Sequence, residues 1–180
     1  MQINEALRDL FNQSAKPLVL AIDGPAGSGK STLASEIARA FAGTYDIEVI
    51  HLDELYNGWD EALSEELFQR LSQLIAAQQA GKVTELAIYD WSAASFSGTR
   101  EIKAVQLLII EGVGSSNQLL QSNLTTSIWL DIEQGIGLAR VLDRDGQEIH
   151  DQMIKWQKME SEYFVRDLTR ERADFILSTQ

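Results

Sequence analysis

Residues 24–31 read Gly-Pro-Ala-Gly-Ser-Gly-Lys-Ser, which satisfies the pattern G-x-x-x-x-G-K-[ST] in full. Glycines at this spacing let successive backbone N–H groups converge on phosphate oxygens. An apolar run precedes the loop and a helical pattern follows it, which is the context that a phosphate-binding loop (P-loop) requires. We therefore expect the chain to bind a nucleoside triphosphate. The residues predicted to contact it are Gly24, Pro25, Ala26, Gly27, Ser28, Gly29, Lys30, Ser31 and Thr32.

Two side chains of the loop have specific chemistry. The Lys30 ammonium can reach the β- and γ-phosphates, and the Ser31 hydroxyl can ligate Mg²⁺. A second Mg²⁺-linked group is predicted at Glu111, which ends the apolar strand 106–110 (QLLII). Ligands of open α/β sheets bind at the carboxyl ends of the strands, which is where Glu111 falls. A solvated charge at a strand end is the plainer alternative for this residue.

Asp53 follows a second apolar strand, 46–52, in the sequence HLDELY. By the same rule, its carboxylate faces the mouth of the site, where it can take the proton from a hydroxyl that attacks a γ-phosphate. The alternative is an aspartate that caps a helix or shapes a turn.

The elements that must position these residues alternate between strand-like and helix-like segments. Such alternation implies crossover connections, a parallel sheet and a three-layer α/β domain that spans residues 1–180. Strands are predicted at 17–22, 46–52, 84–89, 106–110, 127–132 and 173–178, and helices at 30–42, 60–80, 115–122, 133–144 and 148–171.

Composition limits the classes of partner. The 180 residues include 15 basic and 27 acidic side chains, a net charge of −12, which argues against nucleic acid and anionic membranes. The chain contains no cysteine, which excludes disulfides, thiolate zinc sites and thiol nucleophiles and fits a reducing cytoplasm. Neither a signal peptide nor a membrane-spanning run is recognisable, so a cytoplasmic protein is expected. The oligomeric state stays open, a homo-oligomer included.

Three segments together resemble the uridine kinase and phosphoribulokinase family of P-loop kinases: IDGPAGSGKST, HLDELY and LLIIEG. The resemblance implies a P-loop NTPase fold with a mostly parallel five-stranded sheet and a small helical lid at about 133–170. It also implies ATP and Mg²⁺ as cofactors and a small-molecule hydroxyl as acceptor, for example that of a nucleoside. In that family, Asp53 would be the catalytic base and Tyr56 would line the acceptor pocket.

Further positions follow from the same resemblance. Tyr89 and Trp91 match a Tyr-Asp-aromatic segment that contacts the acceptor, and Arg140 and Arg144 match lid arginines that clamp the transferring phosphoryl group. Ala94 and Phe96 depart from it, because the uridine kinases have His and Arg there. The resemblance therefore implies kinase chemistry more strongly than it implies uridine as the acceptor.

Other functions compatible with the loop are a nucleotide-binding regulatory protein with little or no transferase activity, and a nucleotide or coenzyme-precursor kinase. A GTPase is disfavoured because the chain has no Asn-Lys-x-Asp sequence. A nucleotide acceptor would need a further phosphate-binding arginine, for which Arg70 and Arg100 are the candidates near the second and third strands. The basic residues Arg166, Arg170 and Arg172 are expected to form salt bridges on helices.

Overall fold

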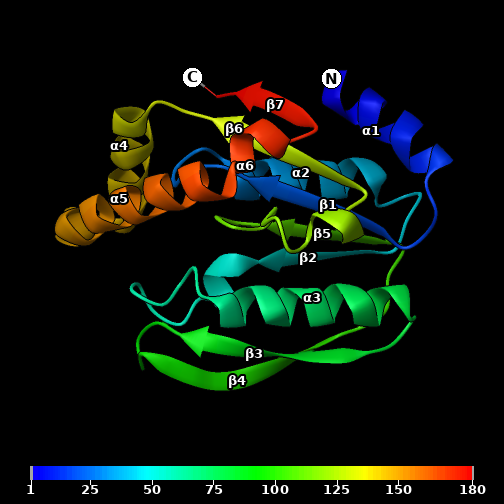
Figure 1. The fold of residues 1–180 in the computed structure, drawn as a ribbon, viewed down its shortest axis with the longest axis horizontal. Coiled ribbons are helices and arrows are strands. Elements are labelled where there is room, and N and C mark those ends of the chain that lie inside the picture. Colours follow the sequence, from blue (N-terminus) through cyan, green and yellow to red (C-terminus); the bar gives the residue numbers. More distant parts are fainter. Residues whose placement is uncertain (1, 180) are drawn as a thin grey trace.

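The computed structural model describes residues 2–179, and within them a five-stranded sheet forms the centre of the molecule (Figure 1). The strand order is β2-β5-β1-β6-β7, and every neighbouring pair is parallel. The strands are β1 (Leu18–Asp23), β2 (Ile47–His51), β5 (Leu107–Glu111), β6 (Thr126–Asp131) and β7 (Phe175–Ser178). The predicted three-layer P-loop fold with a five-stranded, parallel sheet is confirmed.

Burial explains why the central strands could be recognised as apolar runs. All residues of β1 and β5 are buried, as expected for parallel strands covered on both faces. Helices α1 (Gln2–Gln13) and α2 (Lys30–Phe41) pack on one face of the sheet. Helices α3 (Glu65–Gln79) and α5 (His150–Asp167) pack on the other.

A separate antiparallel hairpin consists of β3 (Thr84–Asp90) and β4 (Ser95–Ile102). Figure 1 shows α3 between this hairpin and the main sheet. The strand predicted at 84–89 is confirmed, whereas β4 was missed because only its last residue, Ile102, is buried. Arg100 ties β4 to the main body through ion pairs with Glu48 and Glu54.

Two helix predictions need correction. The helix predicted at 115–122 is wrong: this segment is a series of turns followed by a 3₁₀ turn, Gln121–Asn123. Its backbone N–H groups form short turns, such as Leu120 N–H to the Asn117 carbonyl at 2.8 Å, or bond to side chains, as in the bond from Ser116 N–H to Asp23 at 3.0 Å. The helix predicted at 148–171 is broken at Leu168, whose φ of 53° ends α5 before the short α6 (Thr169–Arg172).

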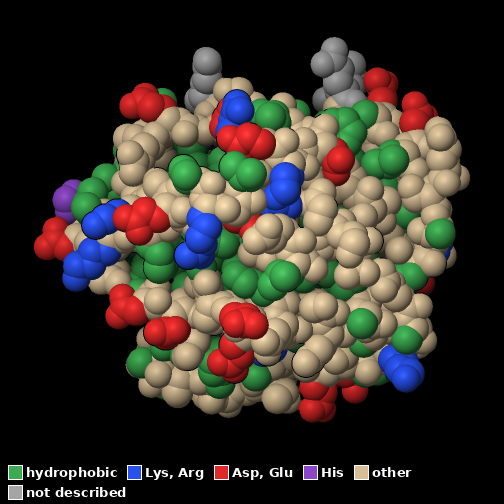
Figure 2. All heavy atoms as spheres, viewed as in Figure 1, with side chains coloured by type: hydrophobic (Ala, Val, Ile, Leu, Met, Phe, Trp, Pro, Cys, Tyr) green, Lys and Arg blue, Asp and Glu red, His purple; other side chains and the backbone are tan. Residues whose placement is uncertain are grey.

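The remaining helix, α4 (Gln134–Asp145), precedes α5 and confirms the helix predicted at 133–144. On the face in Figure 2, Lys and Arg side chains gather mainly over α5 and α6, beside acidic side chains. Arg170 pairs with Asp131 at 2.7 Å and Arg172 pairs with Asp167, so the expected salt bridges are confirmed for these two. The expectation is wrong for Arg166, which forms no salt bridge with the described residues and lies over the Tyr163 ring instead. Among residues 2–179, no helix combines the length and the apolar character needed to cross a bilayer.

Candidate active site

The P-loop connects β1 to α2, and three of its glycines have backbone conformations that side chains disfavour. The φ angles of Gly24, Gly27 and Gly29 are 140°, 77° and 93°. The loop also packs tightly, because a Cβ at Gly27 would overlap the backbone of Gly137 on α4. The glycine spacing therefore serves both the shape of the loop and its contact with α4.

The loop fits a polyphosphate. Gly29 precedes α2 without any side-chain cap, so the first N–H groups of this twelve-residue helix are available to an anion. A Cβ built at Gly29 would meet no atom within 4 Å, which indicates open space above the loop. The Lys30 ammonium curls over the loop and donates to the carbonyls of Gly24 (2.8 Å) and Pro25 (2.9 Å). The buried Ser28 hydroxyl has no hydrogen-bond partner in the described part of the chain.

Ser31 and Glu111 lie together, as the sequence predicted for a metal-linked pair. The Ser31 hydroxyl donates to Glu111 Oε1 at 2.9 Å, and the Glu111 side chain is 5% exposed. His51 Nδ1 lies 2.5 Å from the same oxygen, a contact that the sequence did not predict. Over residues 2–179, no three His, Asp or Glu side chains are grouped as a metal site. A hydroxyl and one carboxylate nevertheless fit Mg²⁺, because it takes few protein ligands when substrate phosphates and water supply the others.

Asp53 lies in the 3₁₀ turn Leu52–Glu54 directly after β2 and is exposed to solvent. Desolvation by the surrounding protein raises the pKa of its carboxyl, while the positive charge of the Lys30 ammonium partly opposes that rise. Glu111 raises the pKa further, and Arg144 and His51 lower it. The Asp53 carboxylate therefore lies within electrostatic reach of Lys30, Glu111 and Arg144.

The two predicted lid arginines lie on α4. Arg140 reaches the P-loop with a long contact of 3.4 Å to the Gly27 carbonyl. Arg144 forms a bidentate pair with Asp145, at 2.7 and 2.6 Å, and its side chain is 65% exposed. Asp145 is the main cause of the raised Arg144 pKa, so the guanidinium stays charged.

The three predicted acceptor-contacting aromatics differ in accessibility. Tyr56 is 2% exposed, and its hydroxyl donates to the Val113 carbonyl at 2.9 Å. Tyr89 is 9% exposed, whereas Trp91 is 41% exposed and donates from its indole N–H to the Asp53 carbonyl at 2.8 Å. The structure thus links Trp91 to the segment that carries the predicted base.

These aromatics belong to a larger cluster. Ring centroids lie 5.2 Å apart for Tyr89 and Trp91, 5.2 Å for Trp91 and Trp59, and 5.9 Å for Trp59 and Trp156. Tyr56 packs on Trp156 at 5.5 Å. A continuous aromatic cluster therefore runs from the hairpin past Asp53 to α5, and Trp91 and Trp59 are its more exposed rings. Trp156 is at the same time part of the hydrophobic core, with an exposed fraction of 6%.

Sequence reasoning missed two buried carboxylates beside the P-loop. Asp23 accepts from the N–H groups of Gly24, Gly114 and Ser116, at 2.8, 3.1 and 3.0 Å, and so joins the P-loop to the loop after β5. Glu160 on α5 accepts from the Ala26 N–H at 3.0 Å. The available indication for Asp23 was its position as the acidic last residue of the buried strand β1. The sequence offered none for Glu160, because it lies 134 residues from its partner.

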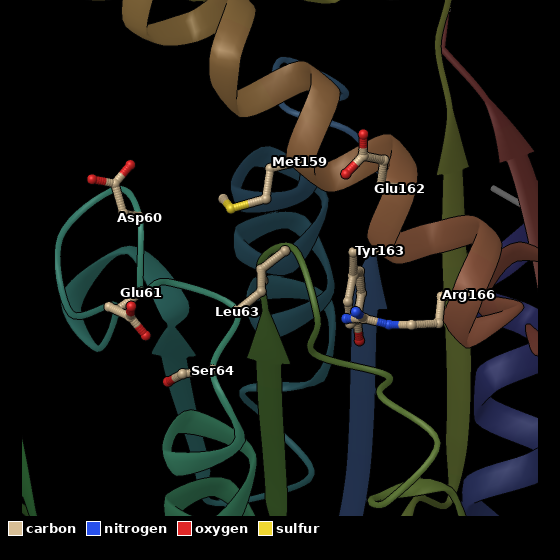
Figure 3. A pocket seen from close by; sticks show the side chains of 8 residues that line it. All are labelled: Asp60, Glu61, Leu63, Ser64, Met159, Glu162, Tyr163 and Arg166. Atoms are coloured by element: carbon tan, nitrogen blue, oxygen red, sulfur yellow. The ribbon is translucent and has the colours of Figure 1, made fainter.

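A cavity of about 150 Å³ lies apart from these groups, between the segment 60–64 and α5. Figure 3 shows Arg166 reaching toward Tyr163 along its wall, where the guanidinium lies 5.9 Å from the ring centroid. Its lining residues are Asp60, Glu61, Leu63, Ser64, Met159, Glu162, Tyr163 and Arg166. None of them is a predicted site residue, so this cavity is distinct from the P-loop site.

The parallel sheet and the P-loop together define the fold of P-loop kinases, and comparison with solved structures supports this fold assignment. A possible uridine kinase from Bacillus stearothermophilus superposes with a TM-score of 0.70 at 21% identity, over 98% of this chain and all of the other. A D-glycerate 3-kinase from Cryptococcus neoformans superposes with a TM-score of 0.64 at 12% identity, over 98% of this chain and 94% of the other.

Sequence comparison leads to the same group. The chain is 27% identical to a uridine kinase from Lactobacillus johnsonii over 156 residues, which cover 76% of this chain and 71% of that protein. It is 27% identical to a uridine kinase from Clostridium novyi over 158 residues, 74% of this chain and 70% of that protein. No family model matches. The predicted resemblance to uridine kinases and related P-loop kinases is confirmed.

Proposed function

We propose that this protein is an ATP-dependent kinase that transfers the γ-phosphoryl group to a hydroxyl of an unphosphorylated small molecule. The observation that carries the proposal is the placement of Asp53. Asp53 lies two residues beyond His51, which is in register with Glu111 across β2 and β5, and the pKa of its carboxyl is raised by desolvation. A raised pKa makes this carboxylate a stronger base than a free aspartate. The likeness to kinases in both sequence and fold supports the same activity.

In this proposal, each side chain has one task. The P-loop N–H groups and Lys30 hold the triphosphate, and Asp53 accepts the proton of the acceptor hydroxyl. A bond forms between the acceptor oxygen and the γ-phosphorus, and the bond from that phosphorus to the departing ADP oxygen breaks. Arg140 and Arg144 stabilise the negative charge that develops on the transferring group.

Ser31 and Glu111 are the groups that would hold Mg²⁺, directly or through water. Bound Mg²⁺ would neutralise phosphate charge. Within the protein itself, Glu111 is held by the Ser31 hydroxyl and by His51, both through Oε1. This arrangement fixes the orientation of the carboxylate before any ligand binds.

The aromatic cluster supports an acceptor with a flat, weakly polar part, such as a nucleoside. Trp91 and Trp59 are the partly exposed rings of the cluster, and Trp91 bonds to the backbone of the proposed base. Phe96, which replaces the family's Arg, packs 5.2 Å from Tyr89 and extends the same surface. Stacking thus takes the place of hydrogen bonds from the His and Arg of typical uridine kinases.

A nucleotide acceptor is less well supported, because both candidate arginines are used elsewhere. Arg100 pairs with Glu48 and Glu54. Arg70 donates to the Leu55 carbonyl at 2.6 Å, and its guanidinium lies 4.8 Å from the centroid of the Phe96 ring. These contacts hold both guanidinium groups against the protein, although the buried Nε of Arg70 has no hydrogen-bond partner among the described residues.

The proposal is tested by acceptor-dependent ADP release over a panel of nucleosides, sugars and vitamin precursors, with MgATP affinity measured in parallel by calorimetry. We expect tight MgATP binding and turnover with at least one uncharged acceptor. Tight binding without turnover on any acceptor would favour a regulatory nucleotide-binding protein instead. Turnover confined to nucleoside monophosphates would show that the acceptor class is wrong.

A further inference from the structure

Glu160 is a buried carboxylate on α5, within the predicted lid region, and it contacts the phosphate-binding loop. It is 2% exposed. Its Oε2 accepts from the Ala26 N–H at 3.0 Å and from the Trp156 indole N–H at 2.8 Å. Its Oε1 lies 3.3 Å from the Ala26 nitrogen and has this one longer contact. Glu160 therefore connects α5 to the P-loop mainly through Oε2, with Oε1 as the more distant acceptor.

This arrangement can hold a proton without losing the contact to the loop. A proton on Oε1 leaves Oε2 free to accept from both Ala26 and Trp156. Only the longer contact of 3.3 Å is given up. The geometry therefore permits α5 to stay docked whether Glu160 is charged or neutral.

The charged and titratable groups around Glu160 make its protonation sensitive to the contents of the loop. Lys30 faces it from the start of α2, Asp23 from β1, and Tyr56 from the segment after β2. Burial raises the pKa of Glu160 to about 7, and Lys30 is the largest influence that opposes the rise. A polyphosphate in the loop would add negative charge and engage the same ammonium, and both effects favour the protonated carboxyl.

We propose that Glu160 is a positioning residue of the phosphate site that takes up a proton when a triphosphate binds. The proposal rests on the loop binding a triphosphate, as the proposed function requires. The neutral carboxyl keeps α5 and Trp156 against the loop while the repulsion between Glu160 and the phosphates disappears. Nucleotide affinity then falls as the pH rises past 7, because binding requires a proton and the proton concentration decreases.

The test is calorimetry of MgATP binding without acceptor, from pH 6.5 to 8.5, in pairs of buffers with different ionisation enthalpies. We expect the parent protein to take up about half a proton per nucleotide at pH 7 and to lose affinity roughly twentyfold across this range. Glu160→Gln keeps an oxygen that accepts from both donors but cannot titrate. The affinity of Glu160→Gln for MgATP should change less than about twofold over the same pH range, when both proteins are corrected equally for the ionisation of the nucleotide itself.

Glu162→Gln is the matched control, because it removes the same charge two residues further along α5. Glu162 is 70% exposed and pairs only weakly with Lys158, at 3.9 Å. This control should retain the pH dependence of the parent. An equal pH dependence in Glu160→Gln would overturn the proposal while leaving nucleotide binding intact. If the parent and both variants are folded and none of them binds MgATP, the proposed function and this inference are overturned together.

A second variant keeps the proposal testable if Glu160→Gln does not fold, as judged by circular dichroism. Trp156→Phe removes an N–H that stabilises the charged carboxylate, so the Glu160 pKa should rise. The range in which affinity falls should then move to higher pH. An unchanged midpoint in this variant would also overturn the proposal.

Discussion

Gly137 determines how closely α4 can approach the P-loop, and replacing it by alanine tests that contact. A Cβ on Gly137 would lie 2.6 Å from the Ala26 carbonyl oxygen, whereas ordinary contacts begin at 3.4 Å. The helix or the loop would have to move by the difference, about 0.8 Å. Because the obstacle is backbone and not a flexible side chain, the displacement falls on the loop that holds the phosphates.

Two opposing effects determine the change in stability. Alanine in a helix interior gains about 1 kcal/mol over glycine. Overpacking typically costs about 1–3 kcal/mol, so the gain at Gly137 should be cancelled or reversed. Gly135 on the same helix is the matched control, since its Cβ would meet only the end of the Glu133 side chain, at 3.3 Å. Gly135→Ala should therefore be the more stable variant by about 1–3 kcal/mol.

Urea unfolding gives the stability of both variants, and steady-state kinetics with a good acceptor gives their turnover. We expect Gly137→Ala to lose roughly tenfold to hundredfold in turnover, because a displacement approaching 1 Å misplaces the reacting groups. Gly135→Ala should keep the turnover of the parent. Equal stability and equal turnover in the two variants would refute the close packing of α4 on the P-loop.

Three further outcomes are expected. Burial raises the Glu160 pKa from 4.5 to about 7, so ionisation of Glu160 destabilises the folded state increasingly as the pH rises through this range. In urea unfolding, the free energy of unfolding of Glu160→Gln should therefore increase relative to that of the parent by up to about 3 kcal/mol between pH 4 and pH 8. A difference that stays constant with pH would contradict this. Trp91→Phe removes the hydrogen bond to the Asp53 carbonyl, so the KM for the acceptor should rise several-fold in initial-rate assays while MgATP affinity stays the same. A loss confined to MgATP affinity would show that Trp91 does not act on the acceptor. Glu111→Gln should raise the Mg²⁺ concentration needed for half-maximal turnover by roughly tenfold to hundredfold, and an unchanged Mg²⁺ titration would remove Glu111 from the metal site.

The central sheet and the P-loop were predictable because their determinants are local. The strands β1 and β5 are short apolar runs buried along their whole length, and such runs are typical of parallel strands. The glycine spacing of residues 24–31 specifies the loop independently of the rest of the chain. Asp53 and Glu111 were placed correctly at strand ends because the carboxyl ends of parallel strands meet at one edge.

The features that were missed depend on contacts distant in sequence. Strand β4 is largely exposed, and it pairs with β3 without an apolar pattern of its own. The segment 115–122 has helix-compatible residues, yet the buried Asp23 accepts from both the N–H and the hydroxyl of Ser116. Glu160 appeared to be one of many acidic residues on a charged helix until the fold placed it against Ala26. Burial of a single polar side chain is set by tertiary packing, which residue spacing does not reveal.

Turnover of Asp53→Asn with a good acceptor tests the central claim most directly. The asparagine side chain has nearly the same shape but cannot accept the proton of the acceptor hydroxyl. The account predicts a fall in kcat of about 10²-fold or more, with MgATP affinity not weakened. A variant that retains the kcat of the parent would contradict the assignment of Asp53 as the base, and with it the observation on which the kinase proposal stands.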